Sequence, residues 1–378
     1  MILNNEKRIL ILRGSSQYVT PGSYNIQEVG LAKALVSSGW KVLIISSGPK
    51  EKSVKYGENI EWLELKRVGT KFGWPKGTLN VVQNFKPDII QCQDITNPST
   101  YIALLIKYKF KIPLVLSIGE YKLNEGLTSI FTKVTALVSR RNTEAILCKT
   151  NSSLSFAKSL GFKNRIYAPV GIDESVYAEE ARANENKAWM DKIVEARRKG
   201  DYLLCHIGRL DKGDNIKFLF DILRKLPSEF KLVLVGEPKD YAESLIDNQI
   251  ENNVILTGAV PNELIGAVLK HSDLYLSCSE YEIFGMAAAE SIYHNCPVIG
   301  YSTGGIKEII IDKVTGLLVE KREVRTWAKI IQKLVHSNEF KKMKLGCNQE
   351  SENLKWSKRA MVYEQAYKKA LQINNNDN

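Results

Sequence analysis

The amino-acid sequence predicts an α/β protein made of two doubly wound, Rossmann-like domains that face each other across a cleft. Short apolar runs rich in β-branched residues alternate with longer amphipathic segments along the whole chain. That alternation is typical of parallel strands joined by crossover helices. The length of 378 residues also exceeds what one hydrophobic core usually supports, which favours two domains.

The first half begins with a βαβ unit. A strand is predicted at 9–12, a helix at 23–38 that ends at Gly39, and a second strand at 42–46. Further strands are expected at 60–65, 89–92, 114–117, 145–148 and 166–168. Asn151 or Ser152 is a typical N-cap residue and would begin a helix that runs to Gly161.

The alternation restarts after a loop near residue 170. A charged, alanine-rich stretch at 179–199 is expected to be helical, and so is 357–373. Strands are expected between them at 202–207, 231–235, 254–257, 274–276, 298–300 and 317–319. We therefore divide the chain into domains at 1–172 and 173–355, with a C-terminal segment at 356–378. Ligands of such domains bind at the carboxyl ends of the strands.

Composition excludes several classes of protein. With 44% hydrophobic and 25% charged residues the chain is not disordered. No apolar run reaches the roughly 18 residues that cross a bilayer, and the start of the chain lacks a secretory apolar segment, so we expect a cytoplasmic protein. The six cysteines form no C-x-x-C pair, and the four histidines lack metal-ligand spacing. We expect buried thiols and no metal site.

Charge is unevenly distributed. The net charge of +11 divides into +13 for residues 1–172 and −2 for the remainder. This asymmetry indicates either a surface that faces an anionic partner, such as a phospholipid leaflet, or ordinary solvated lysines. Nucleic acid is the weakest candidate because no nucleic-acid-binding motif accompanies the basic residues. The densest basic segments are 66–67, 71–76, 107–111 and 140–141, with Trp74 and Phe110 among them.

Two loops of the second half carry groups suited to a sugar diphosphate. Gly208, Arg209 and Lys212 follow a strand, where glycine allows close approach and the two cations suit phosphate oxygens. In the second loop a helix expected to begin near Phe284 would offer free backbone amides to an anion. Glu282 precedes that end and Glu290 lies two turns along. Each loop alone is also consistent with an ordinary turn or with solvated helix acids.

Two further glycine-containing segments begin predicted helices. Thr303, Gly304 and Gly305 follow the strand at 298–300, and Pro21, Gly22 and Ser23 precede the first helix. Either segment could be only a helix start. The loop at 258–260, which includes Val260, is the expected place of nucleotide selectivity.

Taken together these residues resemble the retaining nucleotide-sugar glycosyltransferases of family four, which have the GT-B architecture. The resemblance covers nearly the whole chain. Its most specific part is Glu282 to Glu290, which is similar to the E-x7-E motif of that family. Residues 208–210, 169–173, 296–299 and 21–23 also agree, as do Gly304, Gly305 and Glu308, and all of them occur along the chain in the order that the family has.

The resemblance implies a role for each matching residue. Glu282 would contact the donor hexose, Glu290 the nucleoside ribose, and the amides near Phe284, Gly285 and Met286 the distal phosphate. Gly208, Arg209 and Lys212 would surround the departing diphosphate, and Val260 would complete the donor site. Gly22, Ser23 and Glu120 would lie on the acceptor side. The family works without a metal or other cofactor, and its last helix usually returns to the first domain.

Two positions depart from the family pattern. Asp214 stands where the family usually has its phosphate lysine, and Asn215 stands in the place of the usual glycine. Lys212 is therefore two residues early. The family also commonly keeps a histidine after the strand at 114–117, where this sequence has Ile118, Gly119 and Glu120. Glu120 would then orient the substrate, or the leaving phosphate would act as the base, or the protein is inactive.

The expected function is the transfer of a hexose from a nucleoside-diphosphate sugar to a saccharide or lipid-linked acceptor, with retention of configuration. This fits bacterial-type surface polysaccharide or glycoconjugate assembly, with peripheral attachment to the inner face of the membrane. A nucleotide-sugar epimerase and a non-catalytic binding subunit of the same fold are the alternatives. A glycosidase is disfavoured because no carboxyl pair with the required separation of roughly 5 to 10 Å is evident.

Overall fold

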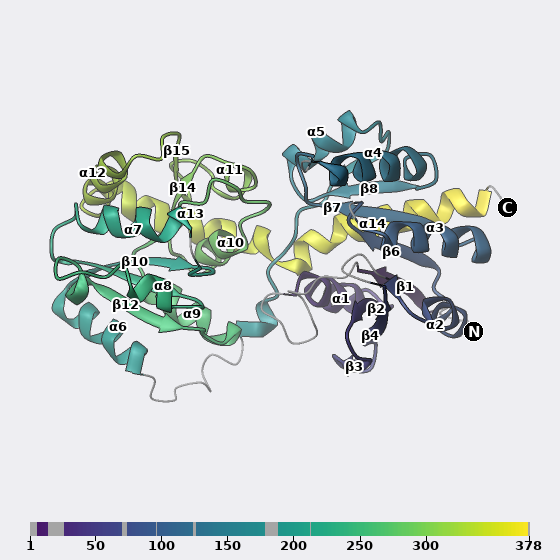
Figure 1. Ribbon diagram of the computed structural model, residues 1–378, viewed down its shortest axis with the longest axis horizontal. Helices are drawn as coiled ribbons and strands as arrows, with labels where there is room; N and C mark the ends of the chain where they lie inside the picture. The colour runs from purple at the N-terminus through teal and green to yellow at the C-terminus, as the bar shows by residue number, and fades with distance from the viewer. Residues whose placement is uncertain are drawn as a thin grey trace. The chain divides into compact units, whose positions relative to one another are not determined.

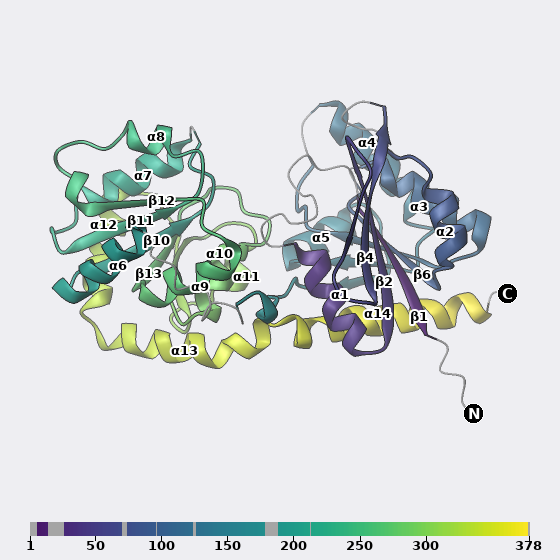
Figure 2. The same cartoon turned by 90° about the horizontal axis from the view of Figure 1, so that it is seen from below.

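The computed structural model describes residues 6–13, 26–69, 74–95, 97–123, 126–177, 188–211 and 213–376. The chain forms two compact units. Unit 1 comprises Met1–Asp173 and Trp356–Asn378, and unit 2 comprises Glu174–Lys355. Both are α/β units built on a mainly or wholly parallel sheet, as Figures 1 and 2 show.

The sheet of unit 1 has the strand order β3-β4-β2-β1-β6-β7-β8-β9, with β5 paired to β4. Its strands are β1 (Lys7–Leu12), β2 (Trp40–Gly48), β3 (Lys52–Lys55), β4 (Ile60–Val68), β5 (Trp74–Pro75), β6 (Ile89–Gln93), β7 (Leu114–Ile118), β8 (Ala145–Cys148) and β9 (Arg165–Tyr167). Its helices are α1 (Gln27–Ser37), α2 (Thr78–Phe85), α3 (Ser99–Phe110), α4 (Leu127–Ser139), α5 (Asn151–Ser159) and α14 (Trp356–Asn376). The central strands are apolar on both faces because helices cover both.

The last helix of the chain, α14, packs on the sheet and helices of unit 1. Its Tyr363 hydroxyl donates to the carbonyl of Ala168 at 2.8 Å, and its Tyr367 hydroxyl donates to Gln91 of β6. Trp356 lies against two glycines, where a Cβ at Gly30 or Gly171 would come within 2.8 Å of its ring. Helix α14 therefore completes the core of unit 1.

Unit 2 has a six-stranded parallel sheet with the order β12-β11-β10-β13-β14-β15. Its strands are β10 (Tyr202–Ile207), β11 (Phe230–Val235), β12 (Val254–Gly258), β13 (Leu274–Ser277), β14 (Val298–Tyr301) and β15 (Gly316–Val319). Its helices are α6 (Ala188–Lys199), α7 (Asp214–Leu223), α8 (Asp240–Glu243), α9 (Asn262–His271), α10 (Met286–Tyr293), α11 (Ile306–Ile309), α12 (Val324–Val335) and α13 (Asn338–Leu354), with a 3-10 turn η2 (Glu251–Asn253).

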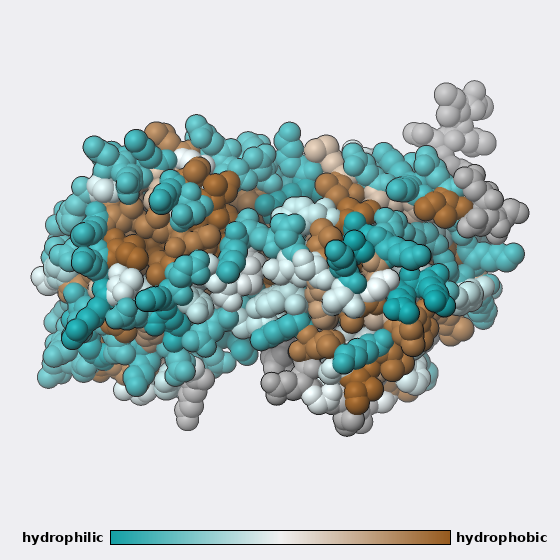
Figure 3. All heavy atoms as spheres, turned by 90° about the horizontal axis from the view of Figure 1, so that it is seen from above, coloured by the Kyte–Doolittle hydropathy of each residue, from teal (hydrophilic) through white to brown (hydrophobic). Residues whose placement is uncertain are grey.

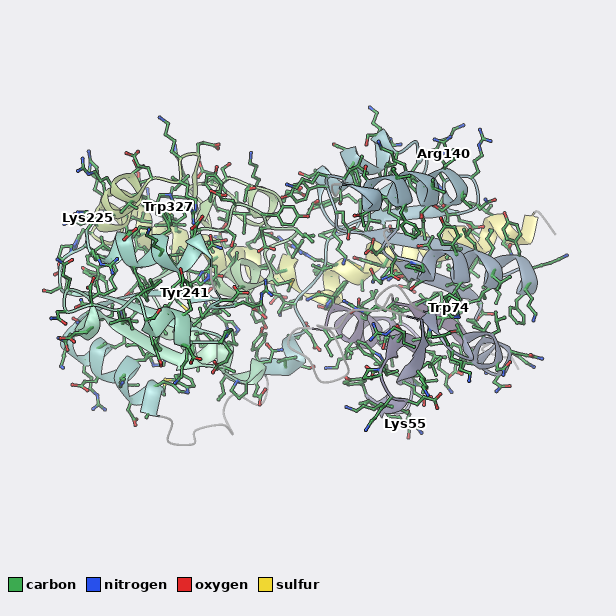
Figure 4. All side chains as sticks on the ribbon, viewed as in Figure 1. Lys55, Trp74, Arg140, Lys225, Tyr241 and Trp327 are labelled. Carbon is green, nitrogen blue, oxygen red and sulfur yellow. The ribbon has the colours of Figure 1, made fainter. Side chains whose placement is uncertain are left out.

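The core of unit 2 lies between its sheet and the helices on either face. Trp327 of α12 is fully buried, and its ring meets that of Phe218 of α7 edge to face at 5.4 Å between centroids (Figure 4). All six cysteines of the chain are buried and free, which confirms the expectation of buried thiols. No helix of the described residues is long and apolar enough to cross a membrane.

The start of α5 differs from the sequence-based prediction, and the predicted starts of two other helices fall on residues that are not described. The N-cap of α5 is Thr150, whose hydroxyl accepts from the backbone N–H of Ser153, whereas the sequence favoured Asn151 or Ser152. A reciprocal bond from the Thr150 backbone N–H to the Ser153 hydroxyl explains the choice. Residues 23–25 of the first predicted helix and 179–187 of the alanine-rich helix lie outside the described residues.

Candidate functional site

A polar pocket of about 510 Å³ lies in unit 2 at the carboxyl ends of its strands. Strands β10 and β13 are neighbours, and the chain continues from them toward opposite edges of the sheet. This is the topological switch point at which open α/β sheets bind ligands. The described lining comprises His206, Ile207, Gly208, Arg209, Asp211, Asp214, Asn215, Tyr275, Ser277, Ser279, Glu280, Tyr281, Glu282, Gly285, Ala287, Ala288 and Arg322.

The first predicted loop, after β10, forms one wall of this pocket. Gly208 and Arg209 line it, and the Arg209 side chain is 74% exposed. Its guanidinium lies 3.5 Å from the carboxylate of Asp211, a weak solvated ion pair that leaves the side chain able to turn. Lys212 lies outside the described residues.

The second predicted loop, after β13, brings Glu282 to the start of α10. Glu282 Oε1 accepts hydrogen bonds from the backbone N–H groups of Gly285 at 3.1 Å and Phe284 at 3.4 Å. Burial raises the pKa of the Glu282 carboxyl, and these amides act in the opposite direction. Helix α10 begins at Met286 rather than near Phe284, because Gly285 has φ +93°, outside the right-handed helical region.

Glu290 is absent from the described lining of the pocket. The residue is 1% exposed, and its Oε1 accepts a hydrogen bond of 2.7 Å from the hydroxyl of Tyr177. The Tyr177 ring meets the His294 ring edge to face at 4.5 Å. Burial, and to a smaller extent Lys270, lowers the pKa of His294 to about 3, so this ring is neutral.

Four predicted donor residues thus come together in the pocket and four do not. Gly208, Arg209, Glu282 and Gly285 line it. Val260, Phe284, Met286 and Glu290 are absent from that lining. The Phe284 backbone still reaches the loop through its amide, although the residue is only 6% exposed.

The glycine-containing segment after β14 packs against the backbone of the Glu282 loop. The backbone N–H of Gly305 donates to the carbonyl of Glu282 at 2.9 Å. A Cβ at Gly305 would come within 2.4 Å of Phe284 Cα, so this close approach of two backbones requires glycine. The segment therefore shapes the site without lining the pocket.

Arg322 is a pocket residue that the sequence analysis did not identify. It follows β15, and its side chain is 15% exposed. Its Nε donates to the carbonyl of Cys278 at 3.1 Å, and its Nη2 donates to Asn215 Oδ1 at 3.1 Å. The guanidinium also lies 4.4 Å from the centre of the Phe218 ring. These contacts fix a second cation in the pocket beside Arg209.

His206 is a second residue that the sequence analysis missed as a site residue. Its Nδ1 lies 2.8 Å from the carbonyl of Leu276, which selects the tautomer that donates from Nδ1. Burial lowers the pKa of this histidine, so the neutral ring presents Nε2 as an acceptor. The sequence analysis placed His206 only within the strand expected at 202–207, and the pairing of β10 with β13 is what brings it to the pocket.

The described lining carries more acids than bases. Asp211, Asp214, Glu280 and Glu282 accompany Arg209 and Arg322. Glu280 lies 3.7 Å from Arg322 and is 71% exposed, so its charge is largely screened by water. Among the described residues no group of three or more His, Cys, Asp or Glu side chains could hold a metal ion.

The predicted acceptor-side residue Glu120 follows β7 in unit 1. Burial, and then the charge of nearby Asp94, raises the pKa of the Glu120 carboxyl to about 7. Asp94 follows β6, the neighbour of β7, so both acids lie at the carboxyl edge of this sheet. Gly22 and Ser23 lie outside the described residues.

Each of the two units matches a model of a known protein family. Residues 188–351 match the family model described as "Glycosyl transferases group 1", and residues 8–150 match "Glycosyl transferase 4-like". The chain belongs to the glycosyltransferases with the GT-B fold. An uncharacterised glycosyltransferase of Methanocaldococcus jannaschii is 25% identical over 327 residues, which are 79% of this chain and 81% of that relative.

Solved structures agree in fold over nearly the whole chain. The sucrose-phosphate synthase of Thermosynechococcus elongatus superposes with a TM-score of 0.75 at 16% identity, covering 97% of this glycosyltransferase and 100% of the synthase. HepE of Anabaena, solved in complex with UDP, superposes with a TM-score of 0.70 at 17% identity. The match covers 96% of this chain and 98% of HepE. Matches to the first two curated relatives span only 48% and 62% of their lengths.

Proposed function

We propose that this glycosyltransferase transfers a hexose from a nucleoside-diphosphate sugar bound in the pocket of unit 2. The observation that carries the proposal is the pocket at the switch point of β10 and β13, with two arginines and the amides before α10 on its walls. Anions bind where backbone amides and guanidinium groups converge. HepE, which shares the fold, was solved with UDP and with UDP-glucose.

In the proposed complex each group acts on one part of the donor. The amides of Phe284 and Gly285 bind the distal phosphate, and the Glu282 carboxylate turns from them toward the hexose. Arg209 and Lys212 neutralise the diphosphate as it leaves. Glu290 contacts the ribose and exchanges its hydrogen bond with Tyr177 for this contact. The reaction retains the anomeric configuration and needs no metal ion.

The acceptor is proposed to bind at the carboxyl edge of the unit 1 sheet. Gly22, Ser23 and Glu120 are its proposed contacts, and a saccharide or a lipid-linked saccharide is the acceptor class. The charge of +13 in residues 1–172 supports an acceptor carried at an anionic membrane surface, as in surface polysaccharide assembly. A non-catalytic nucleotide-sugar binder is the second candidate, because Glu120 stands where the resembling family commonly has histidine.

The test is titration calorimetry with UDP, GDP, ADP and their hexose derivatives, followed by turnover with the best donor and a panel of saccharide acceptors. Binding of one nucleotide-sugar series and net transfer to an acceptor would support the transferase. Binding without transfer or donor hydrolysis would support the non-catalytic binder, and donor isomerisation without acceptor would identify an epimerase. No binding of any nucleotide would contradict the proposal.

A further inference from the structure

Helix α4 of unit 1 exposes its apolar side chains instead of burying them. Four of them are 60%, 46%, 56% and 39% exposed, in the order Ile130, Val134, Leu137 and Val138. Spacings of three and four residues place these side chains on one helix face. The buried face carries small or polar residues, each at most 1% exposed, namely Thr132, Thr135, Ala136 and Ser139.

The buried hydroxyls of α4 are satisfied within the helix itself. Thr132 donates to the carbonyl of Thr128 at 2.8 Å, and Ser139 donates to that of Thr135 at 2.6 Å. The polar face of α4 can therefore be buried against the rest of unit 1 without leaving hydroxyl groups unpaired. A surface helix of an ordinary globular domain has the reverse pattern, so the apolar outer face of α4 indicates a partner.

Helix α3 extends this surface. The Tyr101 ring of α3 lies 5.9 Å from the Phe131 ring of α4, and the two helices pack side by side. Leu105 and Tyr108, on the same side of α3, are 52% and 62% exposed. We define the α4 face as Leu105, Tyr108, Ile130, Val134, Leu137 and Val138. Figure 3 shows hydrophobic surface over this part of unit 1, at its lower right.

The charges around the α4 face select its occupant. Segments 99–111 and 126–142 contain six Lys and Arg residues and no Asp or Glu, and one of the six, Lys107, is paired with Glu144 just beyond them. Lys133 lies within the apolar stripe and is exposed, as are Lys109 and Arg141. Arg140 follows the last residue of α4 (Figure 4). A second copy of this chain would bring like charges together. A surface of anionic lipid instead accepts both the apolar groups and the basic rim.

We propose that the α4 face inserts shallowly into an anionic membrane surface, with α4 lying in the interface. The basic residues then contact lipid headgroups while the apolar stripe enters the acyl boundary. This proposal deepens the proposed function. It rests on that function only in its purpose, which is to bring the enzyme to a lipid-linked acceptor. Lipid binding itself requires no donor and no turnover.

The experiment is co-sedimentation of the full chain with vesicles of phosphatidylcholine alone or mixed with phosphatidylglycerol. The double variant Val134→Gln/Leu137→Gln should reduce partitioning onto anionic vesicles at least about tenfold, because two exposed apolar groups no longer leave water. Its matched control is Leu345→Gln, at a position that is 65% exposed on α13 of unit 2, which should bind as the parent does. Lys133→Gln should weaken binding less and reduce its dependence on salt.

Three outcomes would overturn the inference. The parent could fail to bind either vesicle type, or the double variant could bind as tightly as the parent. Light scattering could instead show a dimer that the double variant abolishes, which would make the α4 face a contact between copies. Nucleotide calorimetry on the same samples separates the two proposals. A chain that binds vesicles but no nucleotide would contradict the proposed function and leave this inference standing.

Discussion

Glu282 occupies the amides that the proposal assigns to the donor phosphate. Its Oε1 accepts from the N–H groups of Gly285 at 3.1 Å and of Phe284 at 3.4 Å. A carboxylate and a phosphate cannot share these donors, because both are anionic acceptors. In the proposed complex Glu282 therefore leaves these amides, and this movement would turn its carboxylate toward the sugar.

Glu282→Gln should lower kcat on the order of a hundredfold, as expected when a charged group acting on the transition state is lost. Donor affinity should be unchanged or tighter, since the neutral amide competes less well with phosphate for the N–H groups. Steady-state kinetics together with calorimetry of the donor measures both effects. A variant with full turnover would contradict the assignment of Glu282 to the reacting sugar.

Glu290→Gln should behave differently and mainly raise the donor KM, because the proposed contact is with the ribose rather than with the reacting centre. Tyr177→Phe removes only the hydrogen bond to Glu290, which is worth about 1 kcal/mol, so its effect on KM should stay within about fivefold in either direction. Comparison of KM and kcat for both variants is the measurement. A fall in kcat without a change in KM for Glu290→Gln would place this residue elsewhere.

The sequence predicted every strand except the short β3 and β5, and it predicted the Gly208, Arg209, Glu282 and Gly285 wall of the pocket, because these follow from local pattern. Each lies at the end of a recognisable strand or at the start of a helix. Arg322 could not be predicted in this way, since it is 107 residues from Asn215, and only the fold brings them together. The buried state of Glu290 depends likewise on Tyr177, which lies in a short 3-10 turn at 174–177 with no periodic signal in the sequence.

The outward apolar face of α4 was also missed, for a different reason. Hydrophobic periodicity predicts which residues share one face of a helix. That the apolar face is the buried one is an added assumption. Here Thr132 and Thr135 are buried and Val134 is exposed, so the pattern alone assigns the wrong face to the core. Tertiary contacts with α3 decide the orientation.

Arg322→Gln should lower donor affinity in proportion to the phosphate charge of the ligand. The guanidinium is held by Cys278 and Asn215, so it is already positioned when an anion enters the pocket. We expect a loss of about tenfold or more for a nucleoside diphosphate, corresponding to a charged hydrogen bond of about 1.5 to 3 kcal/mol, and little loss for the nucleoside. The matched control is Arg325→Gln, an exposed arginine in the first turn of α12. Equal losses for nucleoside and diphosphate would indicate a structural effect of Arg322 instead.

Chelation should have little effect on transfer. The proposed mechanism neutralises the diphosphate with Arg209, Lys212 and backbone amides, so activity in EDTA should match activity in buffer. The measurement is initial rate after dialysis against EDTA, and then with added Mg²⁺ or Mn²⁺. Loss of activity that either ion restores would show that the metal-free mechanism is wrong.

The Glu120 carboxyl makes stability depend on pH near neutrality. Its pKa rises from 4.5 to about 7, first because of burial and then because of Asp94. Between these two values the folded chain holds a proton that the unfolded chain has released, so stability falls as pH rises through this window. Ionisation of Glu120 lowers the free energy of unfolding by its full amount above about pH 7, and it has no effect below pH 4.5.

Glu120→Gln removes this cost, because the amide is neutral at every pH. The variant should gain on the order of 3 kcal/mol relative to the parent at pH 8, and little from this source at pH 4.5. That gain corresponds to an apparent melting temperature higher by several degrees, measured by calorimetric scans from pH 4.5 to pH 8. The matched control, Glu58→Gln at an exposed position, should follow the parent throughout. Parallel curves for Glu120→Gln and the parent would show that Glu120 ionises as freely in the folded chain as in water.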